Sequence, residues 1–340
     1  MRILMLIAMI TKVTSKTIIC DGIIFNDVYY KQEVLFTDIG KPINLFIHKF
    51  SGVIFFSHTI TNGTSIDFAI RSCHIDSRVC NEVKGLPSGY AIGYDAQFDE
   101  IFMGGSDGIY QYNFITKTAT PFGAEDKNIW ALYVNKNFYY IQYPSQKLYV
   151  LQEDGFFKVA EATKIEVEQF FISRDKSVYY SNKTALYKVE LRSRKIIVLN
   201  DDIVVRQIAE DKYGDVYFCA SNGIYVEDKP YRRIKCLAKI DDLYGLTFDE
   251  LDRVIYSDAT SIYRLDKSNY SKLCYEAIRG KIVQPQEPVT TVPLRGNDLN
   301  VRPRDSIDSA LIAKIRNNAY RRINNRRSNL DRERIAQFVH

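Results

Sequence analysis

Asn222-Gly223-Ile224-Tyr225 is one of five similar four-residue stretches that decide the fold. The other four are Asp107-Gly108-Ile109-Tyr110, Gln146-Lys147-Leu148-Tyr149, Thr184-Ala185-Leu186-Tyr187 and Thr260-Ser261-Ile262-Tyr263. Their tyrosines lie 39, 38, 38 and 38 residues apart along the chain. A looser copy, Thr64-Ser65-Ile66-Asp67-Phe68, precedes them by 42 residues. A period this constant indicates six copies of one structural unit.

Each unit has the same internal order of short apolar runs. Two strand-like runs rich in β-branched and aromatic residues precede the tyrosine, and a further run such as residues 195–199 follows the strand that carries it. Four short strands in about 38 residues are typical of one blade of a β-propeller. A helical repeat would need a 3.6-residue periodicity that these runs lack. The sequence therefore predicts an all-β, six-bladed β-propeller over residues 16–280.

A strand ahead of the first unit is expected to close the ring. Residues 28–35 read as an outer strand without a blade of its own. We expect this strand to pair with the last blade near Ser271-Lys272-Leu273-Cys274.

The N-terminus has the features of a secretory signal. Arg2 precedes eight apolar residues, 3–10, and cleavage is expected after Ser15, so residues 1–15 are assigned to a signal peptide. The apolar run is too short to anchor the chain in a bilayer, and no transmembrane segment is expected. Sequons at Asn62, Asn182 and Asn269 are compatible with glycosylation of a secreted, extracellular protein.

The six cysteines form an even set, which in a secreted chain predicts disulfides. Cys20 and Cys274 stand at the two ends of the folded body and are expected to lock the closure of the ring. Cys73 and Cys80 flank a six-residue turn and are expected to pair. A third bond is expected between Cys219 and Cys236 across blade five.

The net charge of +5 comes from the C-terminal tail. Residues 281–340 hold twelve Lys or Arg and six Asp or Glu, so the rest of the chain carries −1, and no nucleic-acid partner is expected. The tail begins with a proline-containing linker, and residues 305–315 are expected to form a short helix with an N-cap at Ser306. Three roles stay open for it: a disordered extension, a contact with polyanions, and proteolytic processing at its arginine pairs.

The mouth of the central channel is the expected binding place of a propeller. The inner-strand starts and the turns between second and third strands supply the candidate ligand-binding residues, which are Tyr90, Trp130, Tyr143, Arg206, Tyr244 and Asp258. Aromatic faces suit a flat conjugated ligand, and Arg206 could bind a carboxylate. Packing between blades for Trp130 and an ordinary salt bridge for Arg206 stay open as alternatives. The recurring tyrosines are assigned to architecture.

An enzyme is the less favoured interpretation. Glu168, Asn182 and Asp258 are the candidates for a metal-dependent lactonase-like or esterase-like site at the same mouth. No nucleophile elbow, His-Glu-x-x-His motif or phosphate loop is present in the sequence. We therefore predict a protein that is not an enzyme, with no catalytic residue, metal or cofactor.

Several stretches resemble the ommochrome-binding proteins of moths and butterflies. They are residues 104–110, 127–132, 143–146 and 241–249, together with Cys20 and residues 28–35. The resemblance covers Cys20 to Cys274 and implies a secreted haemolymph protein that binds pigments such as xanthommatin, which are tricyclic and carry carboxylates. A protein-binding scaffold and the hydrolase remain the alternative functions.

Overall fold

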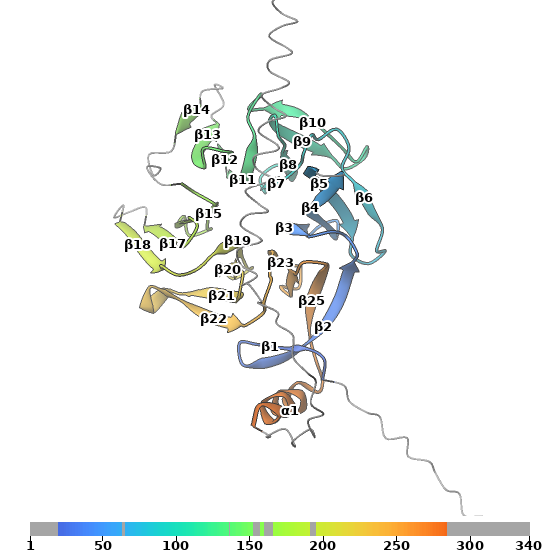
Figure 1. Ribbon diagram of the computed structural model, residues 1–340, viewed down its shortest axis with the longest axis vertical. Helices are drawn as coiled ribbons and strands as arrows, with labels where there is room; N and C mark the ends of the chain where they lie inside the picture. Colours follow the sequence, from blue (N-terminus) through green and yellow to red (C-terminus); the bar gives the residue numbers. More distant parts are fainter. Residues whose placement is uncertain are drawn as a thin grey trace, which may run out of the picture.

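The computed structural model describes residues 20–62, 65–135, 137–151, 157–159, 166–190 and 195–283. The expected signal peptide, the tail from residue 284 onward with its expected helix, and the side chain of Asn62 lie outside this part of the chain. Within it, six antiparallel sheets surround a common centre, as Figure 1 shows. The prediction of a six-bladed β-propeller is confirmed.

Blades 1 to 5 each contain four strands in the order of the sequence. Blade 1 comprises β3 (Ile43–His48), β4 (Val53–Asn62), β5 (Ser65–His74) and β6 (Cys80–Glu82). Blade 2 comprises β7 (Ala91–Asp95), β8 (Glu100–Gly104), β9 (Ile109–Asn113) and β10 (Thr118–Gly123). Blade 3 comprises β11 (Ile129–Asn135), β12 (Asn137–Gln142), β13 (Lys147–Leu151) and β14 (Phe157–Val159).

The second half of the ring repeats this arrangement. Blade 4 comprises β15 (Gln169–Ile172), β16 (Val178–Ser181), β17 (Leu186–Glu190) and β18 (Lys195–Asn200). Blade 5 comprises β19 (Val205–Glu210), β20 (Val216–Ala220), β21 (Gly223–Asp228) and β22 (Arg233–Ala238), with a short 3-10 turn, Lys229–Tyr231, before β22. Blade 6 has five strands, β23 (Gly245–Phe248), β24 (Val254–Ser257), β25 (Ser261–Lys267), β2 (Val28–Thr37) and β1 (Ile23–Phe25).

The recurring tyrosines occupy one register position in the third strand of a blade. Each lies directly opposite a methionine or an aromatic residue of the second strand, as in the pairs Tyr180↔Tyr187 and Tyr256↔Tyr263. In these two pairs the rings stack, with centroids 4.8 Å and 5.3 Å apart. Cross-strand aromatic pairs of this kind stabilise a sheet, so the recurrence of tyrosine is architectural.

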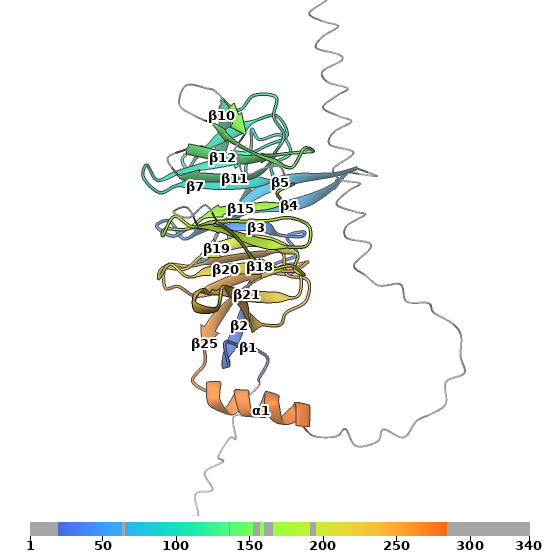
Figure 2. The ribbon, with the colours of Figure 1, turned by 90° about the vertical axis from the view of Figure 1, so that its left-hand side faces the viewer.

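The first unit of the repeat is the exception. In blade 1, Arg71 stands at the register position of the tyrosines and lies opposite Phe56. Arg71 precedes Tyr110 by 39 residues, which agrees with the spacing of the other units. The alignment of Phe68 with the tyrosines is therefore wrong by three residues. The cause is the hairpin of β4 and β5, whose ten-residue strands are longer than their counterparts and project from one face in Figure 2.

The hydrophobic core lies between neighbouring blades. Leu186 of blade 4, for example, packs in one cluster with Ile208 and Phe218 of blade 5. Because each blade buries one sheet face against the next, no blade has a complete core of its own.

Strand β2 closes the ring, as expected. It pairs antiparallel with β25, from Tyr30↔Lys267 to Thr37↔Ser261. The expected partner, residues 271–274, is wrong: β25 ends at Lys267, and Ser271 begins the helix α1 (Ser271–Val283). The helix lies beside β1 and β2 outside the ring (Figure 2), and the hydroxyl of Ser271 donates to the carbonyl of Tyr29 at 2.8 Å.

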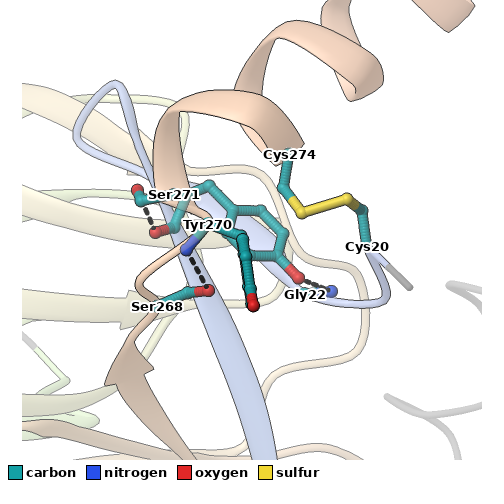
Figure 3. Close-up of a disulfide and its surroundings, with 7 residues drawn as sticks. Cys20, Gly22, Ser268, Tyr270, Ser271 and Cys274 are labelled. Carbon is teal, nitrogen blue, oxygen red and sulfur yellow. Dashed lines mark hydrogen bonds between the residues drawn. A yellow bond between two sulfur atoms is a disulfide. The ribbon is translucent and has the colours of Figure 1, made fainter. Parts of the chain in front are cut away.

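Two of the three expected disulfides are present. Cys20 bonds to Cys274 across 254 residues and joins the segment just before β1 to α1 (Figure 3). Beside this bond, the backbone N–H of Gly22 donates to the hydroxyl of Tyr29 at 3.0 Å. The second bond joins Cys73 and Cys80, which lie opposite each other on β5 and β6.

The expected Cys219–Cys236 bond is wrong, since both cysteines are free thiols. Cys219 pairs with Ile224 on β21, and Cys236 pairs with Tyr225 from the other side of that strand. The two cysteines are thus two strand spacings apart, about 9.5 Å. A disulfide spans at most about 7 Å between Cα atoms, so β21 keeps the thiols apart.

Candidate ligand-binding mouth

One face of the propeller, here called the mouth face, carries the starts of the inner strands and the turns between second and third strands. Strand direction alternates within each blade, so these two sets of segments lie on the same face. The inner strands β3, β7, β11, β15, β19 and β23 surround the centre in Figure 1. The long hairpin of β4 and β5 projects from the mouth face in Figure 2.

Three predicted residues form a continuous aromatic group at blades 2 and 3. Tyr90, just before β7, stacks on Trp130 of β11, with ring centroids 4.0 Å apart and an interplanar angle of 16°. Tyr143 lies in the turn after β12, and its ring centroid is 6.2 Å from that of Trp130. Phe68 of the long hairpin packs edge-on against Tyr90 at 4.7 Å. Tyr90 and Trp130 are half-buried, so part of the pair faces solvent.

Two predicted residues, Arg206 and Tyr244, form a cationic group together with Lys41 at blades 5 and 6. The guanidinium of Arg206 on β19 lies over the ring of Tyr244, with Cζ 4.0 Å from the centroid. Lys41, in the loop that leads to β3, brings Nζ to 4.3 Å from the same centroid and donates to the Tyr244 hydroxyl at 3.0 Å. Cation–π contacts of this type hold both charges beside one ring.

Asn44 lies between the aromatic and the cationic group. Its amide donates to the carbonyl of Tyr90 at 2.9 Å. The next residue, Leu45, donates its N–H to the side-chain oxygen of Gln207, the neighbour of Arg206, at 3.0 Å. Asn44 has a φ of 54°, which Asn tolerates better than most residues, at a break in the register between β3 and β4. At this bulge the chain thus contacts the backbone of Tyr90 through Asn44 and the side chain of Gln207 through Leu45.

Asp258, the sixth predicted residue, caps a turn. Its Oδ1 accepts hydrogen bonds from the backbone N–H groups of Thr260 (2.8 Å) and Ser261 (2.9 Å) in the turn between β24 and β25. Such a bond stabilises the turn locally. These contacts of Asp258 lie within its own turn and not with either group, and its binding role stays a prediction.

The three candidates for a metal site have separate contacts. Asn182 caps the corresponding turn of blade 4 by accepting from the N–H groups of Thr184 and Ala185. Glu168 accepts a hydrogen bond from Gln146 at 2.5 Å. Among the residues that the structure describes, no three His, Cys, Asp or Glu side chains gather as a metal site would require.

Sequence reasoning missed Lys41 and Phe68. Lys41 lies in the loop between the closing strand and the first unit, so the repeat assigns it no position. Phe68 was aligned with the architectural tyrosines, and only the register of β4 and β5 places it in the mouth. The 42-residue spacing of that copy, against 38 or 39 elsewhere, was the available signal.

The fold and this mouth define a β-propeller whose channel entrance combines aromatic and cationic side chains. No protein-family model matches the chain. It is 23% identical over 269 residues to the ommochrome-binding protein of Manduca sexta, a match that covers 78% of this chain and 98% of that protein.

Solved structures with the same fold include enzymes. A gluconolactonase from Xanthomonas campestris superposes with a TM-score of 0.58 at 12% identity, over 72% of this chain and 95% of that one. A luciferin-regenerating enzyme superposes with a TM-score of 0.55 at 12% identity, over 71% of this chain and 96% of that one. At this identity the similarity shows the fold alone. Within the described residues, no helix has the length and apolar character needed to cross a membrane.

Proposed function

We propose that this protein is a secreted binding protein that holds a small aromatic ligand, an ommochrome pigment such as xanthommatin, at the mouth of the propeller. The observation that carries the proposal is the stacked pair of Tyr90 and Trp130 at that mouth. The similarity to the ommochrome-binding protein of Manduca sexta over nearly all of its length supports the choice of pigment.

The ligand contacts the exposed part of the aromatic group. Tyr90 and Trp130 are already parallel, so a planar molecule laid against the pair extends an existing stack. Aromatic contacts of this kind contribute about 0.5–1.5 kcal/mol each beyond the area they bury. Tyr143 and Phe68 hold the pair from its two sides, which limits the ordering cost of binding.

Secretion into an extracellular fluid such as haemolymph is part of the proposal. The Cys20–Cys274 and Cys73–Cys80 disulfides are the type of bond that persists in oxidising compartments. The expected signal peptide and the sequons at Asn62, Asn182 and Asn269 support the same location. Asn269 is exposed at the start of the segment that leads to α1.

Trp130 is the single tryptophan of the chain, and it provides a direct test. Xanthommatin is titrated into the protein while tryptophan emission and pigment absorbance are followed, with free N-acetyltryptophanamide correcting for light absorbed by the pigment. We expect saturable quenching and a spectral shift of the pigment. Pigment binding without quenching of Trp130 would place the ligand elsewhere, and absence of both signals would refute the proposed function.

Variants locate the site. Trp130→Ala is expected to weaken binding about tenfold or more, which corresponds to about 1.4 kcal/mol. The matched control is Tyr213→Ala, which removes an exposed aromatic ring from a turn on the opposite face. Pigment absorbance follows both variants, because Trp130→Ala has no tryptophan emission.

A further inference from the structure

Arg206 and Lys41 bring two positive charges to one aromatic ring. Both cationic centres lie within 4.3 Å of the centroid of Tyr244. We propose that they form an anion-binding subsite, and that the ligand of the mouth is therefore a planar aromatic acid whose carboxylate binds there. This inference rests on the proposed function and adds the side chains that bind the carboxylate of the ligand.

The hydrogen bonds of Arg206 leave its guanidinium available. Nη1 donates to the carbonyl of Leu243 at 2.7 Å, which fixes the side chain over Tyr244. Within the described part of the chain, no carboxylate forms an ion pair with Arg206, and its remaining N–H groups have no acceptor there. A partly buried guanidinium without a counter-ion favours the binding of an anion.

Two other partly buried arginines, both in blade 6, have counter-ions. Arg253 pairs with Asp249 at 2.7 Å and with Asp266 at 2.9 Å. Arg264 pairs with Glu33 and with Asp266. These pairs stabilise blade 6 and its closing strand, whereas Arg206 is directed to the mouth and bonds to the backbone of the next blade. Arg71 is also partly buried and unpaired with a carboxylate among the described residues, but Arg206 alone shares an aromatic ring with a second cation, and this arrangement favours a binding role.

The cationic group and the aromatic group belong to opposite parts of the ring. In Figure 1 the inner strands of blades 2 and 3 lie across the centre from those of blades 5 and 6. Asn44 and Gln207 connect the two sides through the backbone of β3. A ligand that stacks on Trp130 at one end and carries a carboxylate at the other end would engage both groups. A neutral aromatic molecule would engage only one of them.

Two quinolines with the same ring separate the two contributions. Xanthurenic acid carries a ring carboxylate, and quinoline-4,8-diol is the same molecule without it. Dissociation constants are measured by quenching of Trp130 for the wild type, Arg206→Gln and Arg206→Lys. We expect the wild type to bind the acid at least tenfold more tightly than the diol. Arg206→Gln should remove this preference without a change above twofold for the diol, and Arg206→Lys should keep part of it.

A second variant and a control complete the experiment. Lys41→Gln should also reduce the preference for the acid. Lys183→Gln, which removes an exposed lysine from a turn of blade 4 on the same face, should leave it unchanged. Equal effects of the Lys41 and Lys183 variants would remove Lys41 from the subsite.

The outcomes distinguish the subsite from the proposed function. If the wild type binds acid and diol equally, or if Arg206→Gln keeps the preference, the anion subsite is refuted while xanthommatin binding can stand. If xanthommatin binds and neither quinoline does, equal affinities of wild type and Arg206→Gln for xanthommatin refute the subsite. If none of the three compounds binds, the proposed function fails and the subsite with it.

Discussion

Gln207 of blade 5 binds both backbone groups of Leu45 in blade 1, two blades away around the ring. Its side-chain oxygen accepts from the N–H of Leu45 at 3.0 Å, and its amide donates to the carbonyl of Leu45 at 2.6 Å. The same oxygen accepts from the N–H of Leu246 in blade 6 at 3.0 Å. One amide thus satisfies three backbone groups on inner strands of two other blades, which no ladder between these blades provides.

Replacing Gln207 by Leu should destabilise the protein by about 1–3 kcal/mol, because partly buried backbone groups of Leu45 and Leu246 lose their partner. Urea unfolding measures this as a lower midpoint with an unchanged slope. Gln97→Leu, in an exposed turn of blade 2, is the matched control. Substitutions at surface sites usually change the free energy of unfolding by no more than about 0.5 kcal/mol. A change that small for Gln207→Leu would contradict the role assigned to Gln207.

The Cys20–Cys274 bond should contribute more stability than the Cys73–Cys80 bond. The two bonds join residues 254 and 7 positions apart. The chain-entropy model gives losses of about 5.5 and about 2.4 kcal/mol for the paired Cys→Ser replacements. Denaturant midpoints of the two double variants make the comparison, each protein serving as the control for the other. Equal losses would show that closure of the ring does not depend on the tether of α1.

The repeat made the propeller and most of the mouth predictable. Because the tyrosine marks one register position, counting backward from it found the inner-strand start at Trp130 and the residue just before β23, Tyr244. The structure then brought Tyr90, Trp130 and Tyr143 together, and Arg206 onto Tyr244. The side chains that these residues contact belong to neighbouring blades, so they could not be predicted from the sequence of one repeat unit.

The missed features lie where the chain departs from the repeat. Lys41 precedes the first unit. Phe68 reaches the mouth because the long hairpin of β4 and β5 shifts its alignment with the repeat by three residues. The erroneous Cys219–Cys236 pairing came from counting cysteines, whereas the intervening strand β21 decides their separation. Residues 271–274 form the first turn of α1 because the strand β25 has already ended at Lys267.

Stability should fall as the pH drops below about 6.5, the usual pKa of histidine in an unfolded chain. Burial lowers the pKa of His58 in the folded protein, and the nearby charge of Arg71 lowers it further, while Glu82 opposes the shift. On acidification, His58 therefore takes up a proton in the unfolded chain at a higher pH than in the folded protein. The stability that the protein has above about pH 6.5 is lost as the pH falls from there toward the lower pKa of the folded state. His58→Gln should flatten the dependence of urea midpoints between pH 7 and pH 5 relative to the wild type.

The control for this prediction is His74→Gln, a change at the other end of the same long hairpin. It should leave the pH dependence of the wild type in place. If His58→Gln and the wild type lose stability in parallel on acidification, a group other than His58 is responsible. Nε2 of His58 is buried and makes no hydrogen bond to a described residue, so its protonation in the folded state would gain no acceptor.

The two free cysteines should react very differently with an alkylating reagent. Cys236 is exposed on the outer strand of blade 5 and is expected to react with iodoacetamide in the native protein at pH 8. Burial raises the pKa of the Cys219 thiol to about 12, and the thiolate that reacts is therefore scarce as well as inaccessible. Mass spectrometry should find one alkyl group per native molecule, on the peptide with Cys236.

Unfolding without reductant supplies the control for this count. Both thiols should then react, which gives two alkyl groups, while the four cysteines of the two disulfides stay protected. No alkylation even in denaturant would mean that Cys219 and Cys236 are bonded after all. Because β21 separates them, that bond would require blade 5 to lose its strand order, so the result would overturn the sheet topology as well as the assignment of the thiols.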